Sequence, residues 1–452
     1  MMILRWLFVA LLLTLAGCAT QNDGRQAHVA EDTSRTIDLT HPPRDMWDRI
    51  RRGFAIPNLH DERARYWTDY YASHPQSVLL MSQRAGKYLY YIVDQLDQRG
   101  MPTELALLPF VESAYDPNAL SRSKASGLWQ FIPSTGRHYN LQQDIWRDLR
   151  RDPVASTQAA LDYLAYLYDL QGDWYLALAS YNWGEGAVRR AMEKAGQQGQ
   201  QQPTYLTLDL PDETRNYVPK LQAIKNIIAR PEKFGVTLPT VGNTPYFTTV
   251  HKSRDMDLAV AAALAEMPFE DFQALNPSFN KPLILGAHNP PLHLPLDKVS
   301  TFDHNLNTHN GPLATWELAP VRKGQSLATI AKAHGITLGQ LRAVNGLGPR
   351  VNVAGSTPLL VPNQGNGIRL GDQGGQDTNS ISQPDSIARL ISDSQPAVAR
   401  AAAPRMHTIR KGDTLFALAR RYNTSVTALR ELNNLKGSRL ATGKPLRIPA
   451  NQ

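Results

Sequence analysis

Apolar residues in the first half of the chain recur at the spacing of α-helices. From about residue 42 to residue 235 the sequence is rich in Leu, Ala, Tyr and Trp. Leu161 and Leu164, for example, are three positions apart and therefore share one helix face. The pattern predicts an all-helical region, with an N-terminal helical extension at residues 41–100 and a larger domain at residues 101–235.

Two segments of the second half repeat one pattern. Residues 322–347 and 410–435 align without gaps and are identical at nine of 26 positions. Each copy has two short helical patterns between strand-like segments, so each is predicted to fold as strand, helix, helix, strand, at residues 315–363 and 405–449. The sequence between them, residues 364–404, lacks aromatic residues and is predicted to be a flexible linker.

Polar residues mark the helix ends in both copies. Ser326 and Thr414 are placed to cap the first helix. Asn345 and Asn433 are expected to end the second helix, because Asn tolerates the left-handed turn found there.

A weaker third copy precedes these two. Leu258, Phe272 and Asn276 repeat the spacing of the corresponding residues in the later copies. The segment lacks their Lys-Gly start and has Met267-Pro268 at the turn between the helices. We expect a degenerate unit of the same fold at residues 245–297, and its ligand binding stays open.

Length and composition narrow the function classes. The chain has 452 residues, which suggests about three domains of roughly 150 residues. Lys and Arg number 48 against 40 Asp and Glu, a formal charge of +8, but no run of basic residues appears, so we do not expect nucleic acid as a partner. The single cysteine, Cys18, excludes an intramolecular disulfide and a Cys-based zinc site.

The first residues are predicted to direct export and lipid attachment. Arg5 precedes an apolar run at residues 6–15, which is too short to span a bilayer and is typical of a signal peptide. The segment LAGC that ends at Cys18 resembles the bacterial lipoprotein box. The resemblance implies cleavage of a signal peptide at residues 1–17 and a lipid on Cys18 as the membrane anchor.

The residues after Cys18 indicate to which membrane the predicted lipoprotein is sorted. In bacterial lipoproteins an Asp at this point implies retention at the inner membrane, whereas Ala19 and Thr20 follow here. We therefore expect an outer-membrane lipoprotein that faces the periplasm, with residues 18–40 as a flexible tether. An ordinary secretory signal that happens to contain a cysteine is the alternative.

Glu112 is the first candidate for chemistry. Pro102 can begin a helix, and Leu105, Leu108 and Glu112 would then lie on one face of it. A carboxyl group in line with core leucines is partly desolvated, which raises its pKa as a general acid requires. Pro109 should kink this helix because it removes a hydrogen bond. On spacing alone, a helix-end carboxylate paired with an arginine is the simpler interpretation.

Four motifs that include Glu112 occur in a set order. They are Glu112-Ser113, GLWQ at residues 127–130, SYNWG at residues 180–184, and Tyr217 in ETRNYVPK. Together they resemble the lytic transglycosylases of the lysozyme-like Slt family, over residues from about 100 to 234. The repeated units resemble LysM modules, which bind chitin-like and peptidoglycan glycans. The expected fold is multidomain: an all-α lysozyme-like catalytic domain at residues 101–235, followed by small α+β (βααβ) LysM modules.

The Slt resemblance implies a reaction on peptidoglycan. The substrate bond is the β-1,4 linkage from N-acetylmuramic acid to N-acetylglucosamine. Glu112 would protonate the leaving oxygen and then, as a carboxylate, take the proton of the muramic acid C6 hydroxyl, which closes a 1,6-anhydro ring. Because this nucleophile is tethered, no second carboxylate is needed. No metal or organic cofactor is required.

The resemblance also assigns a role to Gln130 and Tyr217. Gln130 is expected to hydrogen-bond a substrate acetamide or to orient Glu112, and satisfying backbone groups is the alternative. Tyr217 is expected to hydrogen-bond Glu112 and keep it positioned, and capping a loop is the alternative.

The other substrate-binding candidates are polar. Tyr181 and Asn182 are expected to line the floor near the acetamido group. Ser121 matches a serine that contacts the sugar in the family, although Ser123 could be confused with it.

Aromatic and acidic neighbours complete the expectations. Tyr115, Trp129 and Trp183 are candidates for stacking on sugar faces, although Trp is as often a core residue. Asp116 is interpreted as a turn residue before a proline. Glu185 receives no role.

Two other functions stay open from the sequence. A hydrolytic muramidase would need a second carboxylate, which Asp116 or Glu185 would have to supply. A non-catalytic lipoprotein would tether the outer membrane to peptidoglycan through its LysM modules, but the intact Glu112 argues against it. The expected partners are peptidoglycan glycan strands and a membrane reached through Cys18, and the sequence does not identify protein partners.

Overall fold

The computed structural model describes residues 42–200, 202–322, 324–348 and 358–363, together with parts of 405–448. The predicted signal peptide, tether and inter-module linker lie outside the described residues. Within the described part, the structure contains no helix that is both long and apolar enough to cross a membrane.

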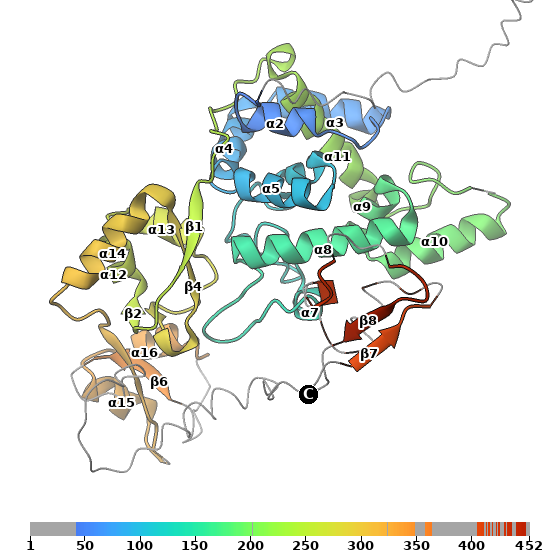
Figure 1. Ribbon diagram of the computed structural model, residues 1–452. Coiled ribbons are helices and arrows are strands. Elements are labelled where there is room, and N and C mark those ends of the chain that lie inside the picture. The colour runs from blue at the N-terminus through green and yellow to red at the C-terminus, as the bar shows by residue number, and fades with distance from the viewer. Residues whose placement is uncertain are drawn as a thin grey trace, which may run out of the picture. The chain divides into compact units, whose positions relative to one another are not determined.

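Helices build the part of the chain from residue 46 to residue 234 (Figure 1). Helix α11 packs against α3, α6 and α9, and helix α8 packs against α5 and α9. In chain order the elements are α2 (Met46–Arg52), α3 (Glu62–Ala72), α4 (Pro75–Ala85), α5 (Leu89–Arg99), the 3₁₀ helix η1 (Thr103–Leu107), α6 (Leu108–Glu112), α7 (Pro133–His138), α8 (Pro153–Gln171), α9 (Trp174–Trp183), α10 (Glu185–Gln197), α11 (Asp212–Ala229) and the 3₁₀ helix η2 (Pro231–Phe234). The expectation of a helical domain is confirmed.

The sequence explains where the longer helices begin. Asp61, Asp152 and Asp173 precede α3, α8 and α9, and each side chain accepts hydrogen bonds from backbone N–H groups of the first turn. Leu161 and Leu164 of α8 are fully buried in the main core. Capping residues and an apolar stripe therefore fix the same helices.

Pro109 divides the helix that the spacing predicted. The segment forms the 3₁₀ helix η1 up to Leu107, and α6 starts at Leu108 with Pro109 in its first turn. A proline has no N–H to donate, so it is accommodated at a helix start and not inside a helix. The single helix expected from Pro102 onward is wrong, and Glu112 ends a helix of only five residues.

Glu104 holds the N-terminal extension on the domain. It is almost fully buried and accepts hydrogen bonds from the backbone N–H groups of Ala55 (3.0 Å) and Ile56 (2.8 Å). Lys225 of α11 forms an ion pair with the same carboxylate at 3.0 Å. A buried charge of this kind is tolerated because all its partners are present.

The next unit has the strands and helices of the predicted third copy. Strands β1 and β4 pair antiparallel, as do the short strands β2 and β3. Met267 and Pro268 form the turn between α12 and α13, as expected, and α14 packs on α12. The elements are β1 (Phe247–His251), β2 (Met256–Asp257), α12 (Leu258–Leu264), α13 (Phe269–Leu275), β3 (Leu283–Ile284), η3 (Gly286–His288), β4 (Pro291–Pro295), η4 (Leu296–Lys298) and α14 (Val299–Thr308).

The two clearer copies have the predicted strand pairs. In the first, β5 (Trp316–Ala319) pairs antiparallel with β6 (Leu359–Pro362) around α15 (Leu327–Ala333) and α16 (Leu338–Asn345). In the second, β7 (Arg405–Thr408) pairs antiparallel with β8 (Pro445–Ile448). Ser326 caps α15 through the N–H of Thr329, whereas Thr414 lies outside the described residues.

One asparagine in each copy ties the second helix to the returning strand. The side-chain amide of Asn345 donates to the carbonyl of Leu360 (2.9 Å), and its oxygen accepts from the N–H of Leu360 (2.8 Å). The same pair of hydrogen bonds joins Asn276 to His293 and Asn433 to Arg447.

The expected reason for this asparagine is therefore wrong. Asn345 is the last residue of α16, and the left-handed residue is the following Gly346, with φ of 67°. In the last copy the left-handed residue is Asn434, with φ of 52°, next to Asn433. The asparagine is required for its amide group and not for its backbone conformation.

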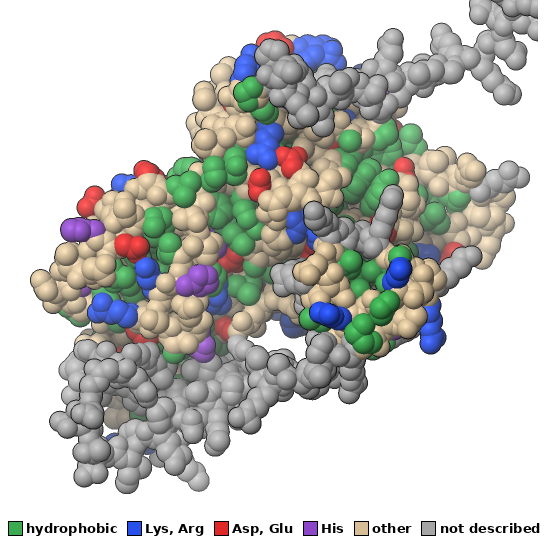
Figure 2. Space-filling model, in the orientation of Figure 1, with side chains coloured by type: hydrophobic (Ala, Val, Ile, Leu, Met, Phe, Trp, Pro, Cys, Tyr) green, Lys and Arg blue, Asp and Glu red, His purple; other side chains and the backbone are tan. Residues whose placement is uncertain are grey.

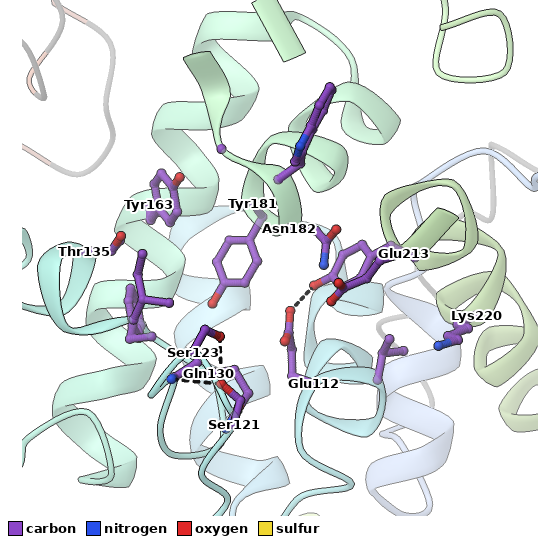
Figure 3. Close-up of a pocket in the computed structure, with 17 residues that line it drawn as sticks. Glu112, Ser121, Ser123, Gln130, Thr135, Tyr163, Tyr181, Asn182, Glu213 and Lys220 are labelled. Atoms are coloured by element: carbon purple, nitrogen blue, oxygen red, sulfur yellow. Dashed lines mark hydrogen bonds between the residues drawn. The ribbon is translucent and has the colours of Figure 1, made fainter. Parts of the chain in front are cut away.

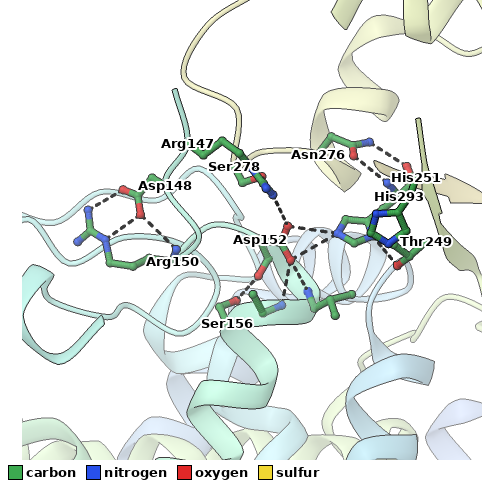
Figure 4. Close-up of polar contacts among 12 residues, drawn as sticks. Arg147, Asp148, Arg150, Asp152, Ser156, Thr249, His251, Asn276, Ser278 and His293 are labelled. Atoms are coloured by element: carbon green, nitrogen blue, oxygen red, sulfur yellow. Dashed lines mark hydrogen bonds and ion pairs between the residues drawn. The ribbon is translucent and has the colours of Figure 1, made fainter. Parts of the chain in front are cut away.

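Hydrogen bonds join the LysM-like unit to the loop before α8 (Figure 4). The N–H of Asp148 donates to the carbonyl of Ser278 at 2.8 Å, and the buried ring of His293 lies 3.3 Å from the Asp152 carboxylate. Burial alone would raise the pKa of Asp152, but His293, the backbone N–H of Ala155 and Arg147 together lower it below its ordinary value. The helix cap of α8 is thus also the contact point for this unit.

The described surface is mixed in charge. On the face drawn in Figure 2, Lys and Arg side chains are interspersed with Asp and Glu side chains and with apolar ones. Among the large apolar side chains, Tyr66 and Tyr70 of α3 are 62% and 42% exposed.

Candidate active site

Glu112 lies in a pocket of about 390 Å³ in the helical domain (Figure 3). In that view Gln130 and Ser121 are on one side of Glu112, and Glu213 and Lys220 are on the other. The lining residues are Val111, Glu112, Ser121, Ser123, Ala125, Gln130, Phe131, Ile132, Thr135, Tyr163, Tyr181, Asn182, Trp183, Gly184, Glu213, Tyr217 and Lys220.

The environment of Glu112 suits a proton donor. Burial raises the pKa of Glu112 to about 7, from an ordinary value of 4.5. The Tyr217 hydroxyl donates a hydrogen bond to the carboxylate and lowers the pKa, the charge of Glu213 raises it, and Lys220 lowers it. A carboxyl group with a pKa near neutral can both give and take a proton at physiological pH.

One face of α11 supplies three of the pocket residues. Glu213, Tyr217 and Lys220 are four and three positions apart, so they line up along the helix. Of this set, only Tyr217 was expected from the sequence. The signal for the other two was present in ETRNYVPK, because residues four before and three after Tyr217 share its helix face.

The end of α9 supplies Tyr181 and Asn182. The Tyr181 hydroxyl donates to the carbonyl of Trp129 at 2.9 Å, and the Asn182 side-chain oxygen accepts from the Thr214 hydroxyl at 2.7 Å. Gly184, with φ of 91°, ends this helix where a side chain would be strained. Both residues are therefore held in place at the pocket wall before any substrate arrives.

A loop held by Arg150 supplies Ser121, Ser123 and Gln130. Arg150 donates to the carbonyls of Lys124 (2.6 Å) and Phe131 (3.0 Å) at the two sides of this loop. Ser121 accepts from the N–H of Ala125, and its hydroxyl lies 3.0 Å from that of Ser123. Both serines line the pocket, so either can meet a sugar.

Gly127 allows the close approach on which this loop depends. Its φ is 84°, and a Cβ atom there would lie 2.1 Å from the Arg150 carbonyl oxygen. Any side chain at residue 127 would push the loop away from the Arg150 backbone. The loop conformation that carries Gln130 thus requires this glycine.

The hydrogen bonds of Gln130 differ from one expectation. Its amide nitrogen donates to the carbonyls of Gly127 (2.9 Å) and Ala119 (3.3 Å). The side chain that donates a hydrogen bond to Glu112 is that of Tyr217. Gln130 therefore does not orient Glu112 by direct contact, although it lines the pocket.

The aromatic expectations divide into one inside the pocket and two in the core. Trp183 lines the pocket, whereas Tyr115 and Trp129 are fully buried and cannot stack on a sugar. Tyr115 donates to the Ala106 carbonyl, and the Trp129 indole donates to Thr157. Tyr163 and Thr135, which were not expected from the sequence, also line the pocket.

The two alternative carboxylates have other contacts. The side chain of Asp116 accepts from the N–H of Asn118 in a turn, as expected. Glu185 accepts from the Tyr163 hydroxyl at 3.0 Å. Neither residue is among those that line the pocket, whereas Glu213 is.

Three family models match separate parts of the chain. The model described as Transglycosylase SLT domain matches residues 90–203. The one described as Lytic transglycosylase MltD, LysM-like domain matches residues 246–311, and the LysM domain matches residues 321–353 and 407–449.

Several known proteins are similar in sequence. Membrane-bound lytic murein transglycosylase D of Escherichia coli (strain K12) is 32% identical over 407 residues, which are 87% of this chain and 83% of that protein. A putative tributyltin chloride resistance protein of Alteromonas sp. (strain M-1) is 36% identical over 171 residues, 38% of this chain and 80% of its own length. An autolysin of Enterococcus faecalis is 24% identical over 144 residues, which are only 16% of its length.

The likeness to the first relative extends over nearly the whole of both chains. The family models add a transglycosylase SLT domain, a LysM-like domain of MltD and LysM domains in this chain. The chain therefore belongs to the family of membrane-bound lytic murein transglycosylase D.

Proposed function

We propose that this protein is a peptidoglycan lytic transglycosylase, a lyase that acts on the glycan strand. It cleaves the β-1,4 bond between N-acetylmuramic acid and N-acetylglucosamine without water and leaves 1,6-anhydro-N-acetylmuramic acid ends. Its LysM modules bind the glycan. Membership of the family and the SLT domain support the activity, and the LysM domains support the binding.

Glu112 carries the chemistry in this proposal. The observation behind it is a carboxyl group at the pocket wall whose pKa burial raises to about 7. As the acid, Glu112 gives its proton to the oxygen of the leaving N-acetylglucosamine while the bond from C1 to that oxygen breaks. The acetamido group of the muramic acid can stabilise the cationic carbon that results.

The same carboxylate then acts as the base. Glu112 takes the proton of the C6 hydroxyl while O6 forms a bond to C1, so the proton given in the first step is recovered. The attacking oxygen belongs to the same sugar, and its effective concentration replaces an activated water. The hydrogen bond from Tyr217 supports the charged form that exists between the two steps.

The remaining pocket residues position the sugars. Tyr181 and Asn182, fixed by Trp129 and Thr214, are suited to hold the acetamido group. Ser121 and Gln130 stand on the opposite side of Glu112 from Lys220 and are suited to contact the neighbouring sugar (Figure 3).

The presence of Glu213 in the pocket makes hydrolysis an alternative reaction that requires a test. A hydrolytic muramidase needs a second carboxylate that activates water, and Glu213 lines the pocket with Glu112. The two reactions differ by one water in the product. An anhydro end supports the transglycosylase, and a reducing end would move Glu213 into the role of base.

Membrane attachment is part of the proposal. The LAGC segment supports a lipid on Cys18, and Ala19 and Thr20 after it favour the outer membrane with the enzyme in the periplasm. A Cys18→Ser variant, which cannot receive the lipid, should no longer be found in the outer-membrane fraction. If it stays with the outer membrane, the anchor lies elsewhere.

Mass spectrometry of released fragments tests the reaction. The chain without residues 1–17 and with Cys18→Ser is incubated with purified peptidoglycan, beside a Glu112→Gln variant as the matched control. We expect fragments one water lighter than hydrolysis products from the first protein and none from the variant. Cleavage that survives in Glu112→Gln would remove Glu112 from the mechanism.

A further inference from the structure

Helix α3 carries aromatic rings on its water-facing side. The exposed residues Tyr66 and Tyr70 and the half-buried Trp67 form what we name the α3 aromatic cluster. The rings of Tyr66 and Tyr70 each lie 5.3 Å from that of Trp67, at interplanar angles of 81° and 75°. One face of the Tyr70 ring lies against His74, with ring centroids 4.4 Å apart at an interplanar angle of 30°, and the Tyr66 ring is the more open of the two to water.

Packing of the fold does not explain the cluster. Helix α3 is seated on α11 through its buried residues Ala64 and Thr68, and the Thr68 hydroxyl accepts from Asn226 of α11. None of the three aromatic residues belongs to the hydrophobic core of the helical domain. Large exposed apolar groups gathered on one side of a helix mark a contact with something outside the chain.

The α3 aromatic cluster adjoins the active-site pocket at Lys220. The indole N–H of Trp67 donates to Asn216 of α11 at 2.9 Å, and the Lys220 ammonium lies 4.5 Å from the centre of a Trp67 ring. Lys220 is also a lining residue of the pocket, on the far side of Glu112 from Gln130 (Figure 3). Lys220 is therefore common to the pocket and the cluster.

A glycan strand is the occupant that fits this continuity. We propose that the α3 aromatic cluster is an outer glycan subsite, on which a strand held in the pocket stacks its sugar rings beyond Lys220. The inference rests on the proposed function. Sugar rings have apolar C–H faces and polar edges, and tyrosine offers a flat apolar face with a hydroxyl at its end.

The composition of the helix argues for sugar over a lipid surface. No exposed aliphatic side chain accompanies the rings on α3, and the exposed residues Glu62, Arg65 and Asp69 lie among them. Helices that lie in a membrane interface combine aromatic residues with a broad aliphatic face. The α3 helix lacks that face.

Kinetics on long and short substrates test the subsite. In the mature chain with Cys18→Ser, the double variant Tyr66→Ala/Tyr70→Ala should raise KM on intact glycan strands roughly tenfold, as expected for two lost ring contacts. Its kcat, and all its kinetics on a fragment just long enough to be cut, should not change. Tyr66→Phe/Tyr70→Phe keeps the rings and should retain most of the affinity. Tyr246→Ala, at a tyrosine that is 40% exposed elsewhere, should have no effect.

The other outcomes overturn the inference. An unchanged KM on long strands would show that no sugar binds the cluster, and an equal loss on long and short substrates would point to a disturbed fold. If the double variant instead loses binding to vesicles of phosphatidylethanolamine and phosphatidylglycerol, the cluster is a membrane contact. A parent protein that releases no anhydro fragments would refute the proposed function itself, which is a separate result.

Discussion

Two substitutions on α11 should move the pH dependence of cleavage in opposite directions. Glu213 raises the pKa of Glu112 and Lys220 lowers it. Glu213→Gln should therefore shift the alkaline loss of activity to lower pH, and Lys220→Met should shift it to higher pH. Both side chains are replaced by uncharged ones of similar length, so the charge is the main change.

The environment of Glu112 sets the size of the effect. With a pKa of about 7, half of the Glu112 carboxyl groups hold a proton at pH 7. With the ordinary value of 4.5, only about 0.3% would, a loss of roughly 150-fold in the acid form, or about 3 kcal/mol. Burial supplies most of this difference. A single charge at the pocket edge contributes a smaller part, on the order of half a pH unit.

The assay is the pH profile of kcat/KM for the release of soluble fragments from peptidoglycan. The unsubstituted enzyme should lose activity above a pH near 7, about tenfold for each further unit, because the proton donor must be neutral. Shifts of both variants in the same direction would refute the electrostatic reasoning. An unsubstituted enzyme whose activity already falls near pH 4.5 would refute the buried-acid assignment.

Three further predictions concern stability. Because the folded pKa of Glu112 exceeds its unfolded value, the stability that neutral Glu112 contributes is complete below about pH 4.5 and is lost as the pH rises through 7. At pH 8, Glu112→Gln should therefore have a free energy of unfolding that is larger than that of the parent by up to about 3 kcal/mol, and should unfold at a higher temperature. At pH 4 the two proteins should unfold at nearly the same temperature. Glu104→Ala leaves Lys225 buried without its anion and should lower the free energy of unfolding by about 3 to 5 kcal/mol in denaturant titrations. A change under about 1 kcal/mol would show that water replaces the Glu104 carboxylate as the partner of Lys225. Asp152→Ala removes the α8 cap and the partner of His293. Limited proteolysis should then cut residues 235–246 faster than in the parent. Equal rates would mean that the other contacts are sufficient to hold the LysM-like unit on the catalytic domain.

Sequence patterns predicted those features that depend on local spacing. Helix α8 follows from its leucine spacing, and both strand pairs of the LysM modules follow from their repeats. The hydrogen bond between Tyr217 and Glu112 was expected from the family resemblance, although the two residues are 105 positions apart. Local pattern combined with a specific family motif was sufficient for these features.

Features that depend on which helix faces meet were not predicted. Trp129 sits inside a pocket motif, yet its ring points into the core toward Thr157, which no spacing within GLWQ reveals. Glu213 and Lys220 share a helix face with Tyr217, but the family motif assigns a role to Tyr217 alone, and the structure adds the other two to the pocket. The contact of His293 with Asp152 joins residues 141 positions apart with no repeat or motif to connect them.

The contacts of the LysM-like unit redefine the smallest part of the chain that should remain active. Asn276 holds the backbone of His293 as its counterparts hold their strands, while the ring of His293 reaches the cap of α8. Arg150, two residues before that cap, holds the loop that carries Gln130. Truncation after η2, at residue 234, would keep α11 but expose one side of the catalytic domain, and we expect a stable minimal enzyme to end after α14, near residue 311. A chain that ends there lacks only the LysM modules, and a chain that ends earlier also lacks part of the support of its catalytic domain.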